Sequence, residues 1–227
     1  MKGKLIVIEG TDCSGKETQT KRLVERLEKE GRDIFTMSFP QYEKPTGRIV
    51  GGPVLGKSYI CPSYFEDIAH TSPKVIGLYY AADRLYHKDY ITEALDAGKT
   101  VILDRYTTSN MGHQGGKMDS PEERAELFDF YKELEYKLLG LPEPDAVIFL
   151  HMPSEKGLEI RLTRDEPLDE AEKNLEHLKR SEQTYIEMSE KFGFKTISCV
   201  DENGEIRTRE DIESEVYELA KEIIDGR

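Results

Sequence analysis

The chain has no apolar run approaching the ~20 residues needed to cross a bilayer, so no membrane-spanning segment is expected. No signal peptide is expected either, because glycine and charge follow the short apolar run near the N-terminus and no small-residue cleavage site appears. Cysteine is scarce. Cys13, Cys61 and Cys199 lie far apart without a CxxC pair, which favours reduced thiols over disulfides or zinc. These absences predict a globular, cytoplasmic protein without a membrane anchor.

Net positive charge is also lacking. The formal net charge of -13 argues against non-specific binding to nucleic acid, whose phosphates the overall field would repel. Any anionic ligand therefore needs a local basic site. Internal repeats and low-complexity segments are absent, and a chain of 227 residues is expected to form one domain, residues 1–227.

Short runs rich in Val, Ile and Leu recur along the chain without the clean alternation of half-buried strands, which favours strands buried on both faces. We expect strands at 4–9, 33–39, 100–105, 145–150 and 194–199. Between them, helical periodicity predicts helices at 18–30, roughly 73–97, 121–139, 154–164, 169–191 and 209–224. The alternation of strands and helices predicts α/β architecture.

The stretch "IEGTDCSGKETQ" contains the spacing GxxxxGK between a predicted strand and a predicted helix, the context that a phosphate-binding loop (P-loop) requires. Its glycines allow successive backbone N–H groups to converge on phosphate oxygens, and its lysine reaches the terminal phosphates. A glycine-rich turn without a ligand is the alternative. The predicted ATP site comprises Gly10, Thr11, Asp12, Cys13, Ser14, Gly15, Lys16, Glu17 and Thr18.

Glu17 stands where such a loop normally has a Ser or Thr hydroxyl that contacts magnesium. A carboxylate is also a hard ligand, so Glu17 is a candidate magnesium ligand. The alternative is that Glu17 only favours the positive helix N-terminus and points to solvent, while Thr18 or water serves the metal.

"TVILDRYTTSNMGHQGGK" places Asp104 and Arg105 at the carboxyl end of a buried strand, where open parallel sheets bind ligands. A structural ion pair is the alternative, but adjacent strand residues usually point to different faces. Upstream, Tyr80 and Arg84 in "LYYAADR" are spaced i and i+4 on one helical face. They suit either base stacking with phosphate binding, or a core aromatic residue beside a surface arginine.

In this order along most of the chain, "EGTDCSGKETQ", "SFPQYEKPTGR", "YYAADR", "DRYTTSNMGHQGGK", "IRLTRDEPLDEAE" and "RSEQTY" resemble the thymidylate kinase family. The resemblance implies a P-loop NTPase fold, with a five-stranded parallel sheet flanked by helices on both faces and a small helical lid at about 157–172. It implies transfer of the γ-phosphoryl group of ATP to deoxythymidine monophosphate (dTMP) for dTTP biosynthesis, with Mg²⁺. It also implies a homodimer.

Carried over to matching positions, the resemblance implies that Asp12 lies near the acceptor sugar and Lys16 on the donor phosphates. Arg84 and Arg105 would hold the acceptor phosphate, while Asp104 would organise the transfer site through magnesium, water or the loop lysine. The remaining side chains that would line the dTMP site are Phe39, Pro40, Tyr80, Ser109, Gln114 and Tyr185. Phosphoryl transfer suits such a set because it depends mainly on alignment and charge compensation.

The chain departs from the family pattern at two cationic positions. Some members carry a catalytic arginine inside the loop, where this chain has Cys13. The lid arginines Arg161 and Arg164, at i and i+3, are candidates to replace that charge, with two surface arginines in exposed ion pairs as the alternative. Many relatives also have an arginine soon after "FP", whereas here the next cations are Lys44 and Arg48.

Three rival functions remain open from the sequence. A deoxynucleoside kinase has a similar loop and acidic–arginine pair but a neutral acceptor, which would not need arginines aimed at a phosphate. A nucleotide-dependent switch is less favoured because a guanine-recognition NKxD motif is absent. A non-catalytic ATP-binding relative is suggested by Glu17 alone.

Overall fold

The computed structural model describes residues 2–163 and 175–226, and the structural statements below concern these residues. Arg164 and the greater part of the expected lid segment lie outside them. The centre of the molecule is a parallel sheet with the strand order β2-β3-β1-β4-β5. Its strands are β1 Leu5–Gly10, β2 Ile34–Ser38, β3 Thr100–Asp104, β4 Ala146–His151 and β5 Lys195–Ser198. The predicted α/β class and all five predicted strand regions are confirmed.

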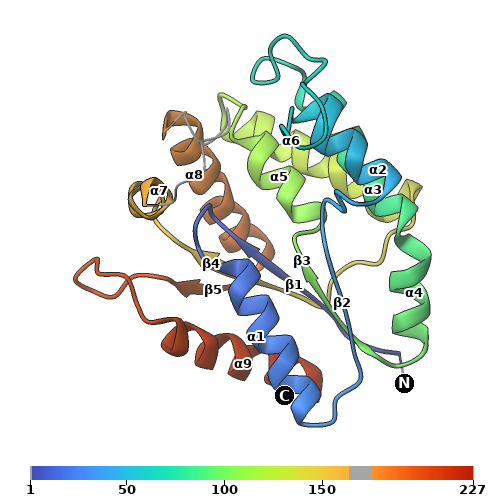
Figure 1. Cartoon of the computed structure of the whole chain (residues 1–227), viewed down its shortest axis with the longest axis vertical. Helices are drawn as coiled ribbons and strands as arrows, with labels where there is room; N and C mark the ends of the chain where they lie inside the picture. The colour runs from blue at the N-terminus through green and yellow to red at the C-terminus, as the bar shows by residue number, and fades with distance from the viewer. Residues whose placement is uncertain (1, 164–174, 227) are drawn as a thin grey trace.

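Helices cover both faces of this sheet (Figure 1). The α-helices are α1 Lys16–Lys29, α2 Pro45–Ile49, α3 Pro73–Tyr86, α4 Lys88–Asp96, α5 Thr107–Gly115, α6 Pro121–Lys132, α7 Ser154–Leu162, α8 Leu175–Phe192 and α9 Arg209–Asp225. Two short π-helical segments are η1 Val50–Val54 and η2 Glu133–Leu138. None of the helices in the described part of the chain combines the length and apolar character needed to cross a membrane.

The central strand β1 shows why the sheet is buried on both sides. Ile6 and Ile8 pack with α1 and α9 on one face, whereas Leu5 and Val7 pack with α4 on the other. Because successive side chains of a strand point to opposite faces, a strand covered on both sides reads as a continuous apolar run. This explains why the run "LIVI" lacks alternation.

The predicted helix at 73–97 is two helices, α3 and α4, separated at His87. The Nδ1 atom of His87 lies 2.8 Å from the carbonyl oxygen of Asp83 and donates to it, so the side chain satisfies a carbonyl at the end of α3. Helical periodicity runs through this break, which therefore left no signal in the sequence pattern.

The predicted helix at 121–139 begins where expected, at α6, but its last part is the π-helical η2. Three further elements, α2, η1 and α5, were not predicted. Helix α5 has the sequence "TTSNMGHQG", which offers no apolar stripe at helical spacing.

The strand register brings the functional motifs to one edge of the sheet. Ile8 of β1 pairs with Asp104 of β3, and Gly10 pairs with Leu150 of β4. The phosphate loop therefore begins between the carboxyl ends of β3 and β4, at the edge where open parallel sheets bind ligands.

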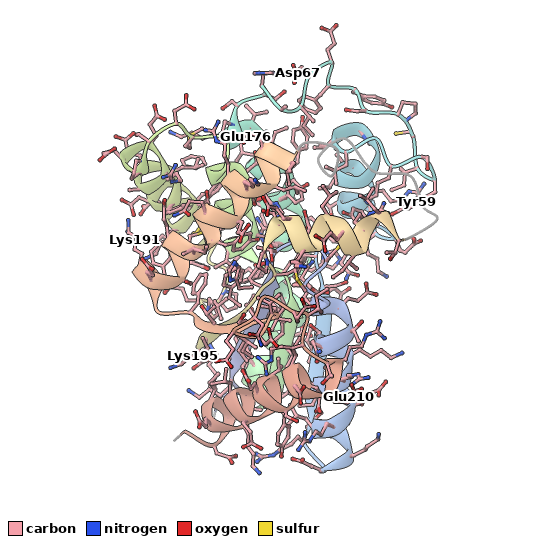
Figure 2. All side chains as sticks on the ribbon, turned by 90° about the vertical axis from the view of Figure 1, so that its left-hand side faces the viewer. Tyr59, Asp67, Glu176, Lys191, Lys195 and Glu210 are labelled. Atoms are coloured by element: carbon pink, nitrogen blue, oxygen red, sulfur yellow. The ribbon has the colours of Figure 1, made fainter. Side chains whose placement is uncertain are left out.

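Figure 2 shows the segment that joins η1 to α3, with Tyr59 and Asp67, at the end of the molecule opposite Glu210 of α9. Lys117 fixes part of this segment, because its Nζ atom donates to the carbonyl oxygen of Ile68 at 2.8 Å. The segment thus adjoins the end of the motif "DRYTTSNMGHQGGK".

Candidate active site

The loop between β1 and α1 has the backbone of a phosphate cradle. Gly15 has a φ of 77°, and Cys13 has a φ of 59°, a left-handed conformation that is uncommon outside glycine. Helix α1 begins after Gly15 without a side-chain cap, which leaves N–H groups of its first turn available to an anion. The Thr11 hydroxyl fixes the loop by donating to the Met152 carbonyl at 2.6 Å and accepting from its N–H at 2.8 Å.

Lys16 and Asp104 are half-buried charged residues on the donor side. Burial lowers the pKa of Lys16, with Arg105 adding to this effect and neighbouring carboxylates opposing it. Burial raises the pKa of Asp104 against the attraction of Lys16 and Arg105. The Oδ1 atom of Asp104 is buried and has no hydrogen-bond partner within the described residues. This carboxylate oxygen is therefore poised to accept a ligand.

Arg105 lies across the loop from these groups and has a φ of 66°. Its Nη2 atom is 3.5 Å from Oδ1 of Asp12, and its Nη1 atom is 2.8 Å from Nε2 of His113. Burial opposes ionisation of Asp12 and raises the pKa of its carboxyl, whereas the neighbouring Arg105 and Lys16 lower it. The predicted residues Asp12, Lys16, Asp104 and Arg105 thus form one charged cluster.

Glu9, at the end of β1, organises the side of the cluster next to α5. Its buried carboxylate accepts hydrogen bonds from the N–H of Tyr106 at 3.2 Å and from the hydroxyl groups of Thr108 and Ser109 at 2.6 and 2.8 Å. The hydroxyl of Tyr185 donates to the same carboxylate at 3.2 Å. Two predicted dTMP-site residues, Ser109 and Tyr185, are therefore tied to one buried anion.

Arg84 is buried and already paired. Its Nε and Nη2 atoms donate to the two carboxylate oxygens of Glu135 at 2.5 and 2.7 Å, and its Nη1 atom lies 3.4 Å from the carbonyl oxygen of Tyr106. Glu135 raises the pKa of Arg84 although burial opposes this. The charge of Arg84 is thus compensated within the protein, unlike the arrangement expected for an arginine devoted to a phosphate.

The other predicted dTMP-site residues differ in burial. Phe39 is buried, with its ring 5.9 Å from that of His87 and 6.1 Å from that of Tyr106, and the Phe39–Pro40 peptide is cis. Tyr80 is half-buried, and Gln114 is buried with an Oε1 atom that lacks a partner within the described residues. Phe39 therefore belongs to the core, whereas the Oε1 atom of Gln114 is available to accept a hydrogen bond from a ligand.

Helix α7 lies directly against the phosphate loop. A Cβ atom on Gly157 would be only 2.7 Å from the carbonyl oxygen of Asp12, so this close approach requires glycine. One turn later, the buried Arg161 lines a cavity together with Asp12, Cys13 and His113. The structure therefore brings the lid arginine to the loop position that lacks an arginine. Arg164 lies outside the described residues.

Glu17 and Thr18 are exposed in the first turn of α1. Glu17 nevertheless contributes to the raised pKa of Asp104, after burial and together with Glu9. No cluster of three or more metal-binding side chains occurs in the described parts of the chain. Magnesium in nucleotide sites is held by one or two carboxylates and substrate phosphates, so the unpartnered oxygen of Asp104 fits such a role.

Comparison with known proteins gives a consistent result. The sequence model of the family "Thymidylate kinase" matches residues 8–212. The chain belongs to the thymidylate kinase family. The resemblance inferred from its motifs is confirmed, and with it the assignment to ATP-dependent nucleoside monophosphate kinases.

Individual thymidylate kinases match over nearly their whole length. The chain is 34% identical to the thymidylate kinase of Prochlorococcus marinus, covering 97% of this chain and 99% of that protein. It is 30% identical to a probable thymidylate kinase of Pyrococcus horikoshii, with 97% of both chains covered. The solved thymidylate kinase structure from Candida albicans shares the fold, with a TM-score of 0.68, 23% identity, and coverage of 97% of this chain and 92% of that chain.

Four residues of this thymidylate kinase site were missed from the sequence. Glu9 had a signal, since a carboxylate at the end of an apolar strand must find partners when buried. His113 lies in the unpredicted helix α5, and Glu135 lies in the π-helical segment that periodicity treated as ordinary helix. The sequence contains no signal for Gly157, whose role follows only from its close approach to the loop in the structure.

Proposed function

We propose that this protein transfers the γ-phosphoryl group of ATP to dTMP, giving dTDP and ADP. The charged cluster at the end of β1 carries the proposal. Lys16 stands on the donor side of the phosphate loop, and Arg105 stands across it, paired with Asp12 at 3.5 Å. Two half-buried cations on opposite sides of a phosphate loop suit the joining of two anionic substrates better than the binding of a neutral nucleoside.

In this proposal an oxygen of the acceptor phosphate attacks the γ-phosphorus while the bond to the bridging oxygen of ADP breaks. Lys16 and the loop N–H groups hold the donor phosphates, Arg105 holds the acceptor phosphate, and Arg161 compensates the charge that develops between them. Arg84, whose charge Glu135 already balances, keeps only its Nη1 edge for the acceptor. Alignment and charge compensation are the main contributions that a protein makes to this reaction.

The thymidine part of the acceptor would lie beside Tyr80, Ser109 and Gln114. Tyr80 offers a half-buried ring for stacking on the base, and Gln114 offers a buried amide oxygen without a partner in the described chain. Phe39 and Pro40 shape the floor of this pocket, and Tyr185 supports it through Glu9.

Mg²⁺ would accompany ATP, with Asp104 as one candidate protein ligand because its buried Oδ1 atom has no partner within the described residues, and Glu17 as a second candidate. When bound, the ion neutralises charge on the donor phosphates. If Glu17 faces the ion, Glu17→Ser changes the magnesium dependence of turnover. An unchanged magnesium dependence would instead assign Glu17 to the helix N-terminus alone.

The proposal includes a homodimer that acts in the cytoplasm. Helix α3 exposes an apolar stripe at helical spacing, made of Val75, Leu78, Tyr79, Leu85 and Tyr86. These side chains point out of the core, and such a contiguous patch suits contact with a second copy. All three cysteines are free thiols, which suits a reducing compartment.

ADP release in a coupled assay tests the function, with ATP and magnesium present and a panel of nucleosides and nucleoside monophosphates as acceptors. We expect dTMP to be preferred. Lys16→Ala should lower turnover by on the order of 100-fold or more, whereas Lys21→Ala, an exposed lysine on the same helix, should keep it. Equal rates without preference for dTMP, or activity confined to nucleosides, would refute the proposal.

A further inference from the structure

The guanidinium of Arg105 is held at both terminal nitrogens. Nη2 lies 3.5 Å from Asp12 of the phosphate loop, and Nη1 lies 2.8 Å from Nε2 of His113 in α5. Arginine has only donors and keeps its proton in proteins, so Nη1 must donate and Nε2 must accept. The His113 ring is then neutral, with its proton on Nδ1.

His113 is itself held in place by α8. Its ring meets the edge of Tyr185 at a centroid distance of 5.7 Å and an interplanar angle of 88°, and Nδ1 lies 3.5 Å from the hydroxyl oxygen of Ser181. Tyr185 stacks in turn on Phe149, with ring centroids 5.2 Å apart. The imidazole of His113 therefore connects Arg105 to the packed rings of Tyr185 and Phe149.

The charges around His113 favour the neutral ring. Burial, with the adjacent positive charge of Arg105, lowers the pKa of His113 to about 3 although Asp12 opposes the shift. A protonated ring would place a second cation against Arg105 and remove the acceptor at Nε2. Charged and titratable groups face His113 from the phosphate loop, the end of β3, α1, α7 and α8, namely Asp12, Cys13, Lys16, Arg105, Arg161, His177, Glu182 and Tyr185.

We propose that His113 is a positioning residue for Arg105, accepting a hydrogen bond at Nε2 and so fixing the guanidinium plane toward the acceptor phosphate. This proposal rests on the proposed role of Arg105 in binding the acceptor. Asp12 and His113 lie in different parts of the fold, and each contacts one Nη atom of Arg105. The guanidinium is therefore oriented before the acceptor binds. An oriented arginine loses less conformational freedom on binding and therefore binds more tightly.

The alternative is that the ring of His113 only packs against Tyr185. His113→Phe separates the two roles, because phenylalanine keeps an aromatic ring at this position and lacks the acceptor nitrogen. His113→Gln is the matched rescue variant, since its amide oxygen can accept from Arg105 while the ring is lost. A packing role predicts that Phe is tolerated and Gln is not, and the positioning role predicts the reverse.

Calorimetric titration of each variant with dTMP, without ATP, measures the effect apart from turnover. We expect His113→Phe to weaken dTMP binding by about tenfold, the scale of one hydrogen bond to a charged group, and to leave ATP binding unchanged. His113→Gln should stay within about threefold of the parent protein. Normal dTMP affinity in His113→Phe would overturn the proposal, as would equal weakening in both variants.

Nitrogen NMR of the ligand-free, histidine-labelled protein gives a second test that needs no variant to fold. We expect Nε2 of His113 to be unprotonated and its shifts to stay constant between pH 8 and about 5. Titration of His113 in this range, or a proton on Nε2, would overturn the proposal. A protein that binds dTMP as expected but transfers no phosphoryl group would refute the proposed function and leave the positioning role intact.

Discussion

Arg84 and Arg105 illustrate how far residue type alone defines a role. Both were expected at the acceptor phosphate. Arg84 instead forms a bidentate ion pair with the carboxylate of Glu135. Arg105 is oriented by the carboxylate of Asp12 and the neutral imidazole of His113. The sequence identified both arginines because they lie in family motifs. It could not identify their partners, since Glu135 and His113 are distant along the chain or lie in elements without periodicity.

Because the phosphate loop lacks an arginine, Arg161 is the main candidate to supply the missing catalytic charge. We predict that Arg161→Ala lowers kcat by about 1,000-fold, because an arginine that compensates charge in phosphoryl transfer contributes on this scale. Arg22→Ala is the matched control, since Arg22 pairs with the exposed Glu210 far along α1 from the loop. Steady-state kinetics decide the matter, and near-normal kcat in Arg161→Ala would show that the lid arginine is not catalytic.

His113 also predicts a pH dependence of stability. Its folded pKa of about 3 lies below the value near 6.5 of an unfolded chain, so only the unfolded chain gains this proton as pH falls below 6.5. Acidification therefore removes stability through this residue, and His113→Phe should lose on the order of 1 to 2 kcal/mol less than the parent protein between pH 7 and 5.

Urea unfolding at the two pH values measures this difference. The lowered pKa of Asp12 acts below its ordinary value of 3.8, outside this window, and other groups cancel in the comparison. Equal losses of stability in the two proteins would contradict a neutral buried His113.

At the scale of elements, the sequence predicted the helices and strands that a local pattern of apolar residues marks. The strands β1, β3 and β4 were found because strands buried on both faces are continuous apolar runs. The edge strands β2 and β5 were also found, although their side chains are partly exposed and the expected burial on both faces was wrong for them. Helices α1 and α9 were found because one face of each is apolar. The break at His87 and the π-helical η2 were missed, since the apolar pattern of both segments continues as in ordinary α-helix. The missed α5 carries Ser109, His113 and Gln114 of the candidate site.

The buried pair of Arg84 and Glu135 joins α3 to η2, and both side chains are almost fully buried. Arg84→Met or Glu135→Leu alone leaves an uncompensated buried charge, and we expect each to cost about 3 to 5 kcal/mol of unfolding free energy. The double variant should cost less than either single change, because no charge remains buried. Urea unfolding of the three variants tests this, and additive losses in the double variant would contradict a coupled pair.

At the scale of the whole molecule, the fold explains why distant motifs meet. The order β2-β3-β1-β4-β5 places the ends of β1 and β3 side by side, so a loop near residue 10 and an arginine near residue 105 share one edge. From the sequence, the family resemblance implied the five-stranded parallel sheet and one shared site for the loop and Arg105, but not the strand order. Composition and periodicity alone predicted only the α/β class, because strand order depends on long-range packing.

The exposed stripe on α3 predicts the assembly state. We expect the protein to elute at twice the mass of the chain, and Leu78→Asp to convert it to a monomer by placing a charge in the apolar contact. Ile206→Asp, which changes an exposed apolar side chain outside the stripe, should leave the dimer intact. Light scattering after size exclusion measures both, and a parent protein of single-chain mass would contradict the dimer.

The fate of the γ-phosphoryl group tests the central claim most directly. ATP labelled at the γ-phosphate is incubated with magnesium and either dTMP or thymidine, and the products are separated. We predict that the label appears in dTDP, in step with the ADP formed, and that thymidine gains none. Label in dTMP made from thymidine, or no transfer to dTMP, would contradict the proposed reaction.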